Sequence, residues 1–353
     1  MSRSTRLWMM LMTAAILLGA TGVTAATKSA PAKKPVVKKP APKPASNHAT
    51  AGTTQLKGEY ANFGSTYTLG KEYPLNITLK SAEYSLGPVI IGEKTYVPTA
   101  DEKLLILHMT YHNPQPQECF VRWDTFTFTV VDPGDQNHDG LIDLGVEKDK
   151  SSCSMSFKPA QKVDVFGVMA VPAAKEMPKL IIKSSDELVL RYNLKGKVNG
   201  LPQGFANPSD KTGATAYAEV PAKPGAYYPL GMLEVKVNSL ESNDKSEMGE
   251  LQLEDGEKFV IVNMDVKNVS TTEQFVRWDT FNPVIIDTDG VEAASCSDMF
   301  QKSKDKSFSA NLKPGQEVSV RCVFTPSDDT DVQTLSLRLD EGRLFLFDVG
   351  KAQ

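Results

Sequence analysis

Histidine and cysteine, on which many active sites depend, are scarce in this sequence: its 353 residues include four of each. None of the motifs G-x-S-x-G, H-E-x-x-H or C-x-x-C occurs, and neither does a glycine-rich phosphate loop. Acid–base catalysis would have to rest on carboxylates, and 43 acidic residues give no means of choosing a pair. These absences favour a non-catalytic protein, and no catalytic residue is predicted. The alternative is a carboxylate-based hydrolase or carbohydrate-active protein, since paired acids can hydrolyse glycosides.

Acidic residues are missing from the first 55 positions, which begin with an export signal. Arg3 and Arg6 precede the apolar run 7–18, and the small residues 23–25 fit a cleavage site. The run is shorter than the roughly 20 residues of a membrane span, which favours cleavage over an anchor. Residues 1–25 are therefore predicted to be a signal peptide. The mature protein is expected to be secreted, periplasmic or at the cell surface, without a transmembrane span.

Residues 26–55 consist mainly of alanine, lysine, proline and threonine, with six lysines, five prolines and no acidic residue. This composition cannot bury enough apolar surface to offset its chain entropy, which predicts a disordered linker. The segment would act as a plain spacer or as an electrostatic tether to an anionic envelope polymer or lipid headgroups.

The rest of the chain is acidic. Without residues 1–55, 31 basic residues stand against 43 acidic ones, a net charge of −12. A body of this sign repels nucleic-acid phosphates, so nucleic acid is not an expected partner.

The heptapeptide FVRWDTF occurs twice, as residues 120–126 and 275–281. The match extends around it without a gap, since residues 103–126 and 258–281 are identical at 12 of 24 positions. Further matches at the same offset of 155 include Tyr73-Pro74-Leu75 with Tyr228-Pro229-Leu230, Lys158-Pro159 with Lys313-Pro314, and Leu180 with Leu335. One register held over about 120 residues indicates a duplicated domain.

A unit of about 125 residues can bury its own core, so each copy is expected to be a globular domain. The predicted domains are residues 56–194 and 227–353. Residues 195–226 are rich in glycine, proline and serine and are predicted to be a connector.

Within each copy, apolar residues alternate in short runs such as LLILHMTY, FVIVNMDV, KVDVFGVMAV and EVSVRCVF. A period of two predicts strands, the turn signals HNPQP and KPGQ separate them, and no sustained helical stripe is present. Short strands at this spacing predict an all-β protein made of two tandem antiparallel immunoglobulin-like β-sandwiches.

Three motifs of the second copy carry a family resemblance: an N-x-S turn at 268–270, the segment 281–290, and LKPGQEVSVRCVFTP at 312–326. Together they resemble the telokin-like, immunoglobulin-like domains of secreted bacterial proteins, a family of unknown function. The first copy departs from the pattern at Pro159-Ala160-Gln161, which lacks the glycine. The resemblance covers both copies. It implies a sandwich fold and an extracytoplasmic setting, and it carries over no catalytic residue.

The heptapeptide itself allows two interpretations. As a strand, it would turn Trp123 into the core beside Val121, with Arg122 and Asp124 paired on the other face. Alternatively it forms a ligand patch present once per domain, because tryptophan and arginine are enriched at binding hot spots. The patch would comprise Arg122, Trp123, Asp124, Arg277, Trp278 and Asp279.

The segment DQNHDGLID, residues 135–143, reproduces the first nine positions of a calcium-binding loop. The twelfth position holds Val146 instead of the usual acid, and an acid follows one place late. The predicted ligands of a structural calcium ion are Asp135, Asn137, Asp139, Leu141 (through its carbonyl), Asp143 and Glu147. The alternative is an acidic hairpin loop, as expected for residues 287–290 of the second copy.

The four cysteines fall two in each copy, and in an exported chain they predict disulfides. Pairing within a domain favours Cys119–Cys153 and Cys296–Cys322. A buried free thiol is the alternative for Cys322, which is in phase with apolar neighbours. The repeat aligns Cys153 either with Phe308 or, if the Asp-Gly loop is longer in the first copy, with Cys296.

Other metal sites are not favoured. Methionines near two of the cysteines would suit copper(I), but core thiols and core methionines explain the same pattern. His108 and His112 lie on one strand face, yet their counterparts Asn263 and Lys267 form no metal site, which indicates a solvated polar face. The sequence therefore predicts an exported, non-catalytic binding, adhesion or scaffold protein, with calcium as its one predicted cofactor. Its expected partner is a protein or an envelope polymer.

Overall fold

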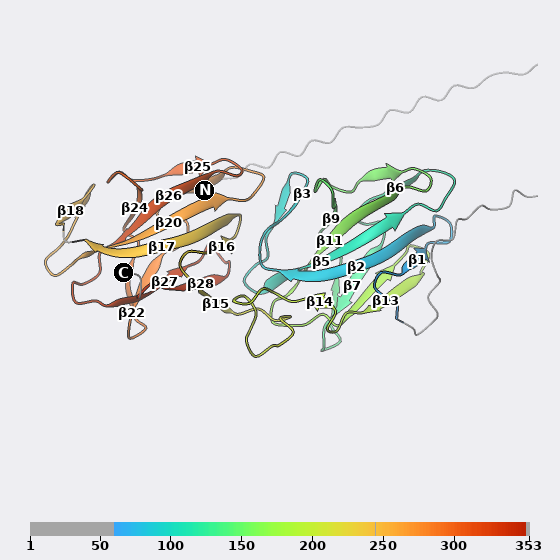
Figure 1. Cartoon of the computed structure of the whole chain (residues 1–353), viewed down its shortest axis with the longest axis horizontal. Helices are drawn as coiled ribbons and strands as arrows, with labels where there is room; N and C mark the ends of the chain where they lie inside the picture. The colour runs from blue at the N-terminus through green and yellow to red at the C-terminus, as the bar shows by residue number, and fades with distance from the viewer. Residues whose placement is uncertain (1–59, 244, 351–353) are drawn as a thin grey trace, which may run out of the picture. The chain divides into compact units, whose positions relative to one another are not determined.

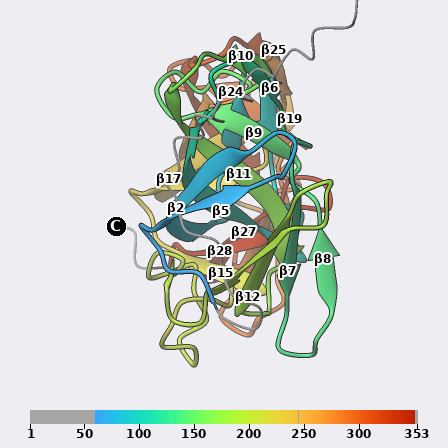
Figure 2. The same ribbon diagram turned by 90° about the vertical axis from the view of Figure 1, so that its right-hand side faces the viewer.

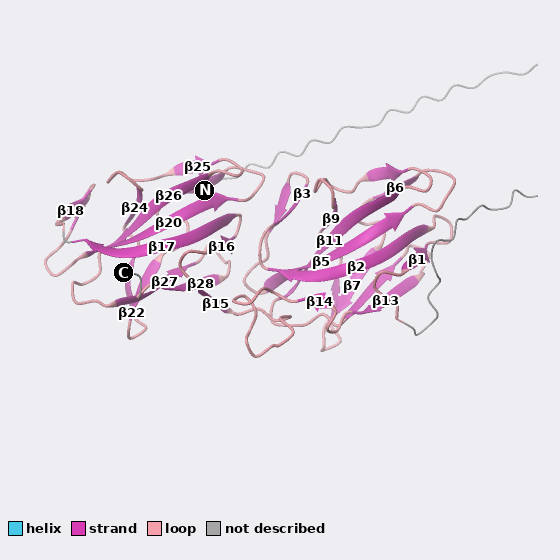
Figure 3. Cartoon of the chain, viewed as in Figure 1, coloured by secondary structure: helices cyan, strands magenta, loops and turns pink. Residues whose placement is uncertain are grey.

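In the computed structural model, the described residues 60–243 and 245–350 form β-strands joined by turns and loops (Figure 1). The predicted all-β fold is confirmed, because no helix forms in this part of the chain, as Figure 3 shows. None of the described residues therefore provides a helix long and apolar enough to cross a membrane. The predicted signal peptide, 1–25, and linker, 26–55, lie outside the described residues.

The first β-sandwich has a larger sheet in the order β1-β2-β5-β11-β9, with β14 paired to β2, and a smaller sheet in the order β13-β12-β7-β8. The larger sheet consists of β1 (Thr66–Leu69), β2 (Leu75–Ser85), β5 (Glu102–His112), β9 (Asp143–Val146), β11 (Lys162–Pro172) and β14 (Val198–Asn199). The smaller sheet consists of β7 (Thr127–Val131), β8 (Asn137–Asp139), β12 (Lys179–Lys183) and β13 (Val189–Asn193). Two short pairs complete the domain: β3 (Val89–Ile91) with β4 (Lys94–Tyr96), and β6 (Cys119–Val121) with β10 (Met155–Phe157).

The second β-sandwich has one sheet in the order β16-β17-β20-β26-β24 and one in the order β15-β28-β27-β22-β23. The first consists of β16 (Tyr227–Leu230), β17 (Leu233–Asn243), β20 (Phe259–Asn268), β24 (Asp298–Gln301) and β26 (Glu317–Phe324). The other consists of β15 (Glu219–Ala222), β22 (Val284–Asp287), β23 (Glu292–Ser295), β27 (Val332–Leu337) and β28 (Leu344–Asp348). The short pairs here are β18 (Glu247–Met248) with β19 (Leu251–Gln252), and β21 (Gln274–Val276) with β25 (Ala310–Leu312).

Each sandwich has its own apolar core, formed by the inward faces of its two sheets. In the first, Leu105 and Leu107 of β5 share one cluster with Leu180 of β12, and all three are fully buried. Figure 2 shows β5 and β11 in one layer and β7 and β12 in another. The second sandwich packs Val262 of β20 against Leu335 of β27 in the same way. Burial alternates along strands such as β1 and β12, as the period-two pattern predicts. The central strands β5, β11 and β20 instead contain runs of consecutive buried residues.

A buried asparagine stands at the end of a central strand in each sandwich. Asn268 ends β20, and its side chain is fully buried. Its Nδ2 donates to the carbonyl oxygens of Thr272 (2.7 Å) and Leu312 (2.8 Å), and its Oδ1 accepts from the backbone N–H of Ser270 (2.9 Å). Leu312 lies in β25, so the side chain ties the strand end to a second strand.

Asn113, which follows β5, makes the corresponding bonds. Its Nδ2 donates to the carbonyl oxygens of Gln117 (2.8 Å) and Phe157 (3.0 Å), and its Oδ1 accepts from Gln115 N–H (2.9 Å). Four of the residues in this network have their counterparts 155 positions later. A buried polar group is tolerated only when it is hydrogen-bonded, and both amides meet that requirement.

Other hydrogen bonds also recur at this offset. Lys103 Nζ donates to the carbonyl oxygens of Ala173 (3.2 Å) and Lys175 (2.6 Å). Lys258 Nζ donates to those of Asp328 (2.9 Å) and Thr330 (2.7 Å).

The offset of 155 residues does not hold at the first hairpin. The sequence match of Tyr73-Pro74-Leu75 with residues 228–230 therefore does not correspond to a structural match. Tyr67 Oη accepts from Asn62 N–H (2.8 Å) as Tyr228 Oη accepts from Lys223 N–H (2.9 Å), so Tyr67 is the structural counterpart of Tyr228. Five residues join β1 to β2, whereas two join β16 to β17. The three additional residues of the first sandwich include Tyr73, whose surface is 72% exposed.

The predicted connector, 195–226, is largely part of the two sandwiches. Its strand β14 pairs with β2, and its residues Leu201 and Ala214 are buried in the first core. Its strand β15 pairs in parallel with β28 of the second sandwich. In the first sandwich Ala61 forms an equivalent parallel bridge with Tyr192. Edge strands present unpaired N–H and C=O groups, and these contacts cover them.

We predict that one turn distinguishes the stabilities of the two sandwiches. Ala160 has φ 61°, and its counterpart Gly315 has φ 76°, in turns of otherwise matching sequence. Because a side chain is disfavoured in the left-handed region, Ala160→Gly should stabilise the first sandwich by about 0.5–1 kcal/mol. The reciprocal Gly315→Ala should destabilise the second by about 1 kcal/mol, since nothing else lies within 4 Å of the new Cβ. Urea denaturation of both variants measures these shifts, and a loss of stability in Ala160→Gly would contradict the prediction.

Candidate binding surface on the repeated heptapeptide

The heptapeptide begins as a short strand and continues as a turn. Its strand ends at Val121 in β6, which pairs with β10, and the valine side chain is buried. Thr125 N–H then donates to the carbonyl of Arg122 (3.0 Å), while Arg122 N–H donates to Thr125 Oγ1 (2.8 Å). Thr280 and Arg277 repeat both bonds, at 3.1 and 2.9 Å.

This turn directs the tryptophans toward solvent. Trp123 and Trp278 are 49% and 43% exposed. The interpretation that Trp123 packs in the core beside Val121 is therefore wrong, because strand alternation stops at the valine. The buried aromatic residues of the heptapeptides are instead Phe126 and Phe281.

The remaining side chains of each turn form an exposed group of aromatic and paired charged residues. Phe120 and Phe275 are 59% and 52% exposed. Arg277 binds Asp279 through two hydrogen bonds, Nε to Oδ1 at 2.6 Å and Nη2 to Oδ2 at 2.7 Å. Arg122 and Asp124 form the same ion pair in the first sandwich. We call these two groups the heptapeptide surfaces: Phe120, Arg122, Trp123 and Asp124, and Phe275, Arg277, Trp278 and Asp279.

Folding stability does not account for these side chains. An exposed ion pair contributes at most about 1 kcal/mol, and an exposed aromatic side chain contributes little of its possible burial energy. The structure thus brings the predicted patch residues together on one exposed turn of each domain. Sequence reasoning did not single out Phe120 and Phe275, although they belong to the repeated segment.

In the first sandwich the heptapeptide surface continues into an open groove. Tyr73 of the longer β1–β2 hairpin lies along it with Phe120 and Arg122, and the segment 184–186 also lines it. Since the shorter hairpin of the second sandwich has no residue equivalent to Tyr73, the two heptapeptide surfaces differ in their surroundings. The sequence match at Tyr-Pro-Leu concealed this difference.

The groove also carries carboxylates. Asp186 accepts hydrogen bonds from Ser184 Oγ and from the backbone N–H of Lys71. The Ser184 hydrogen bond is the largest cause of a lowered pKa for Asp186. This carboxylate is thereby kept ionised, whereas the general acid of a glycoside hydrolase needs a raised pKa.

The predicted calcium ligands are distributed over two sheets. Asn137 and Asp139 lie in β8, which pairs with β7, whereas Asp143 begins β9 in the larger sheet. Leu141, between them, is buried in the core. Extended chain rises by about 3.3 Å per residue, so these positions cannot curl around one ion while the strands are intact.

The same side chains have other partners. Asp135 Oδ1 accepts from Lys179 Nζ (2.9 Å), and Asp143 Oδ2 accepts from Tyr96 Oη (2.7 Å). Glu147 is hydrogen-bonded to the partly buried His108. Within residues 60–243 and 245–350, no group of three or more His, Cys, Asp or Glu residues is arranged to hold a metal ion.

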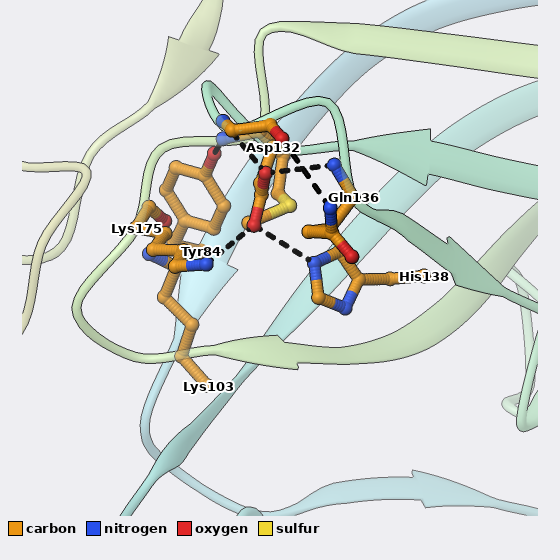
Figure 4. A network of polar contacts seen from close by, with 8 residues as sticks. Tyr84, Lys103, Asp132, Gln136, His138 and Lys175 are labelled. Carbon is orange, nitrogen blue, oxygen red and sulfur yellow. Dashed lines mark hydrogen bonds and ion pairs between the residues drawn. The ribbon is translucent and has the colours of Figure 1, made fainter.

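The β7–β8 hairpin is anchored by Asp132, a residue that the sequence analysis did not single out (Figure 4). Its buried carboxylate pairs with Lys175 Nζ (2.6 Å) and accepts backbone N–H bonds from Gly134 (2.8 Å) and Gln136 (3.0 Å). His138 Nε2 lies 3.4 Å from Oδ2 of Asp132, the oxygen that also pairs with Lys175. The hydrogen bond from Lys175 is the largest cause of the lowered pKa of Asp132. Nothing in the local sequence indicates this pairing, since the two residues are 43 positions apart.

Lys103 lies in the same region (Figure 4), with its ammonium 4.2 Å from the centroid of the Tyr84 ring. Its side chain is fully buried and, through its carbonyl acceptors, holds the segment that includes Lys175. Burial lowers the pKa of Lys103 to about 8.

Asp287, the counterpart of Asp132, accepts N–H bonds from Asp289 (2.9 Å) and Val291 (2.8 Å). The turn itself is therefore common to both sandwiches.

The structure does not bring Cys119 and Cys153 together, so this predicted disulfide is not formed. All four cysteines of the chain carry free thiols in this structure, and the register of β6 with β10 places Cys119 opposite Phe157, four residues beyond Cys153. A disulfide requires Cα atoms within about 7 Å, and four extended residues span about 13 Å.

Cys153 N–H donates to Leu144 O (2.7 Å), and Phe308 N–H donates to Met299 O (2.6 Å). Cys153 therefore corresponds to Phe308, the first of the two alignments considered.

The fold and this surface define an all-β protein of two β-sandwiches with aromatic residues displayed on turns. Residues 225–343, in the second sandwich, match the family described as Domain of unknown function (DUF4352). No curated protein matches the chain.

Three solved structures are similar to part of the chain. An uncharacterized β-sandwich protein from Clostridium difficile has 16% identity and a TM-score of 0.29, with 37% of this chain and 95% of that chain covered. The secreted protein MPT63 from Mycobacterium tuberculosis has 13% identity and a TM-score of 0.30, with 38% and 99% covered. The yjhA protein from Bacillus subtilis has 17% identity and a TM-score of 0.27, with 36% and 97% covered.

Thermal unfolding with added calcium and with chelator tests the hypothesis, drawn from the sequence, that residues 135–143 bind calcium. If the loop binds calcium, free calcium at a concentration of about 100 times the Kd would stabilise the first sandwich by roughly 2.7 kcal/mol. That corresponds to a rise in Tm on the order of 10 °C. Because the hairpin separates the ligands, we expect no difference between the two conditions. A rise that is lost in Asp135→Ala and Asp139→Ala would instead show that the loop rearranges around the ion.

The buried pairing of Asp132 predicts an acid-sensitive first sandwich. Because the pKa of Asp132 is lowered on folding, its stabilising effect is present above the unfolded value near 3.9 and is lost as the pH falls toward the folded value. Chemical denaturation at pH 7, 4 and 3 should show a steeper loss of stability for the natural protein than for Asp132→Asn. Asp287→Asn is the control, because Asp287 is the counterpart of Asp132 in the second sandwich and does not pair with a lysine. Equal pH slopes for the natural protein and Asp132→Asn would contradict this role.

Proposed function

We propose that this chain is an exported, non-catalytic binding protein whose heptapeptide surfaces engage a partner outside the cytoplasm. The observation that carries the proposal is the repetition of one exposed arrangement, a phenylalanine, a tryptophan and an Arg–Asp pair, on matching turns of both sandwiches. Tryptophan and arginine are enriched at binding hot spots, where removing one side chain often costs 2 kcal/mol or more.

We further propose that both sandwiches are copies of one domain, although the family match covers only the second. The support is the set of equivalent hydrogen bonds, above all those of Asn113 and Asn268 and those of Lys103 and Lys258. Two copies would give the protein two binding surfaces. A partner with repeated epitopes could then bind both, and the gain in affinity through effective concentration can reach 10² to 10⁴.

The partner best suited to this arrangement is a protein or polymer of the cell envelope. The signal predicted at 1–25 supports export, and the acidic body disfavours nucleic acid. The six lysines of 26–55 suit contact with an anionic envelope polymer or lipid headgroups. Aromatic faces next to a paired arginine and aspartate offer both apolar contact and hydrogen bonding to such a partner.

A carboxylate-based hydrolase is the weaker alternative. The groove beside Tyr73 combines aromatic walls with carboxylates, as such an enzyme would. Three carboxylates line it, those of Glu72, Asp124 and Asp186. Asp124 and Asp186 are engaged by Arg122 and Ser184, and a lowered pKa for Asp186 opposes a role as general acid. These contacts favour a surface that binds without reacting.

Binding is tested by sedimenting the full mature chain with isolated bacterial cell-wall sacculi and, separately, with immobilised envelope proteins. Trp123→Ala and Trp278→Ala should each lower the affinity about tenfold or more, and the double variant should lower it by a larger factor. Tyr60→Ala, which removes another half-exposed aromatic residue, is the matched control and should bind like the natural protein. If the double variant binds both materials as tightly as the control, the heptapeptide surfaces are not the binding sites.

A further inference from the structure

The second sandwich contains two thiols that meet where the chain crosses between its sheets. Cys322 lies on β26 and is fully buried, opposite Met299 of β24. Cys296 lies between β23, which belongs to one sheet, and β24, which belongs to the other. Its side chain is also buried, and both residues are part of one core cluster.

The two sulfurs are direct neighbours. A hydrogen bond between the two thiols is the largest cause of the raised pKa of Cys322. Cys296 Sγ donates to the carbonyl oxygen of Asp298 (3.1 Å). No other cysteine of the described chain lies in this core cluster.

The first sandwich gives independent evidence that these two positions touch. The counterparts of Cys296 and Cys322 at the offset of 155 are Leu141 and Gly167. A Cβ built on Gly167 would lie 2.9 Å from Leu141 Cδ2, so the leucine side chain fills the space over the glycine. In the second sandwich two cysteine side chains occupy the space that one leucine occupies in the first.

We propose that Cys296 and Cys322 form a disulfide that joins the two sheets of the second sandwich, while Cys119 and Cys153 remain thiols. The bond would connect the sheet crossing to the central region of β26. It encloses a loop of roughly 25 residues, a length at which cross-linking is expected to give substantial stabilisation. The first sandwich achieves the corresponding contact by apolar packing alone.

The reaction is a thiol–disulfide exchange with a protein disulfide oxidant of the extracytoplasmic compartment. One cysteine of the chain, as its thiolate, attacks one sulfur of the oxidant's disulfide and forms a mixed disulfide with it. The oxidant's other sulfur leaves as a thiolate and is protonated to a thiol. The second cysteine then attacks the first, forming the Cys296–Cys322 bond and releasing the oxidant's sulfur from the mixed disulfide. The two cysteines lose two protons and two electrons, and the oxidant becomes a dithiol.

Burial determines when this reaction occurs. A hydrogen bond that the Cys322 thiol donates to Cys296, together with burial, raises the pKa of Cys322, so the folded, reduced pair reacts slowly. The bond should therefore form while the sandwich folds, and once formed it should resist reductants until the domain unfolds.

Mass spectrometry of the full chain, purified from an oxidising compartment, tests the proposal. The protein is denatured and alkylated without reductant, then digested with trypsin. Peptides 278–302 and 322–338 should appear joined and two hydrogens lighter than their sum, with Cys119 and Cys153 alkylated. Alkylation of all four cysteines, or a link between any other pair, would overturn the proposal.

Variants add a measurement of its effect. Cys322→Ala should lower the Tm of the second sandwich by on the order of 10 °C relative to the oxidised protein. Full reduction under denaturing conditions followed by refolding with reductant should lower the Tm of the natural protein similarly. Cys153→Ala, which alters a buried but unpaired thiol, is the matched control, and its Tm should remain sensitive to reductant. Equal Tm values for oxidised and reduced natural protein would contradict the stabilising role, even if the bond forms.

Discussion

A buried asparagine side chain fixes the position of each heptapeptide surface. Asn113 and Asn268 each donate to one carbonyl in the loop that leads to the heptapeptide and to another on the strand paired with it, β10 or β25. Leaving a buried carbonyl without a partner costs about 1–3 kcal/mol, so the loop and the strand pair cannot move apart easily. The exposed aromatic residues thus stand on a rigid base, and a partner that binds them needs to order little additional chain.

The two sandwiches differ in the identity of their core residues but are identical in the exposed heptapeptide. β5 buries Leu105 and Leu107 where β20 buries Val260 and Val262, and such exchanges are tolerated because apolar packing depends on total volume more than on identity. The turn that follows is identical in both, including exposed side chains that contribute little to folding. This contrast is the physical argument for assigning function to the heptapeptide surfaces rather than to the cores.

The sequence was sufficient where structure depends on local pattern, and insufficient where it depends on distant contacts. Alternating apolar residues predicted the strands, and the repeat predicted two sandwiches. The sequence left open whether Trp123 is buried or exposed, because it did not show that a turn closed by a threonine hydroxyl ends the strand earlier than alternation implies. The pairing of Asp132 with Lys175 and the separation of Cys119 from Cys153 depend on how strands register, which residue spacing does not specify.

The parallel pairing of β15 with β28 has a consequence for where the second domain begins and ends. The family match spans 225–343, which leaves out both β15, at Glu219–Ala222, and β28, at Leu344–Asp348. Similarity in sequence therefore identifies a segment smaller than the unit that folds. A fragment cut at Tyr227 would retain β28 with one edge uncovered, and such an edge can pair with another chain. Dissection of this protein should accordingly keep the strand that precedes the recognisable domain.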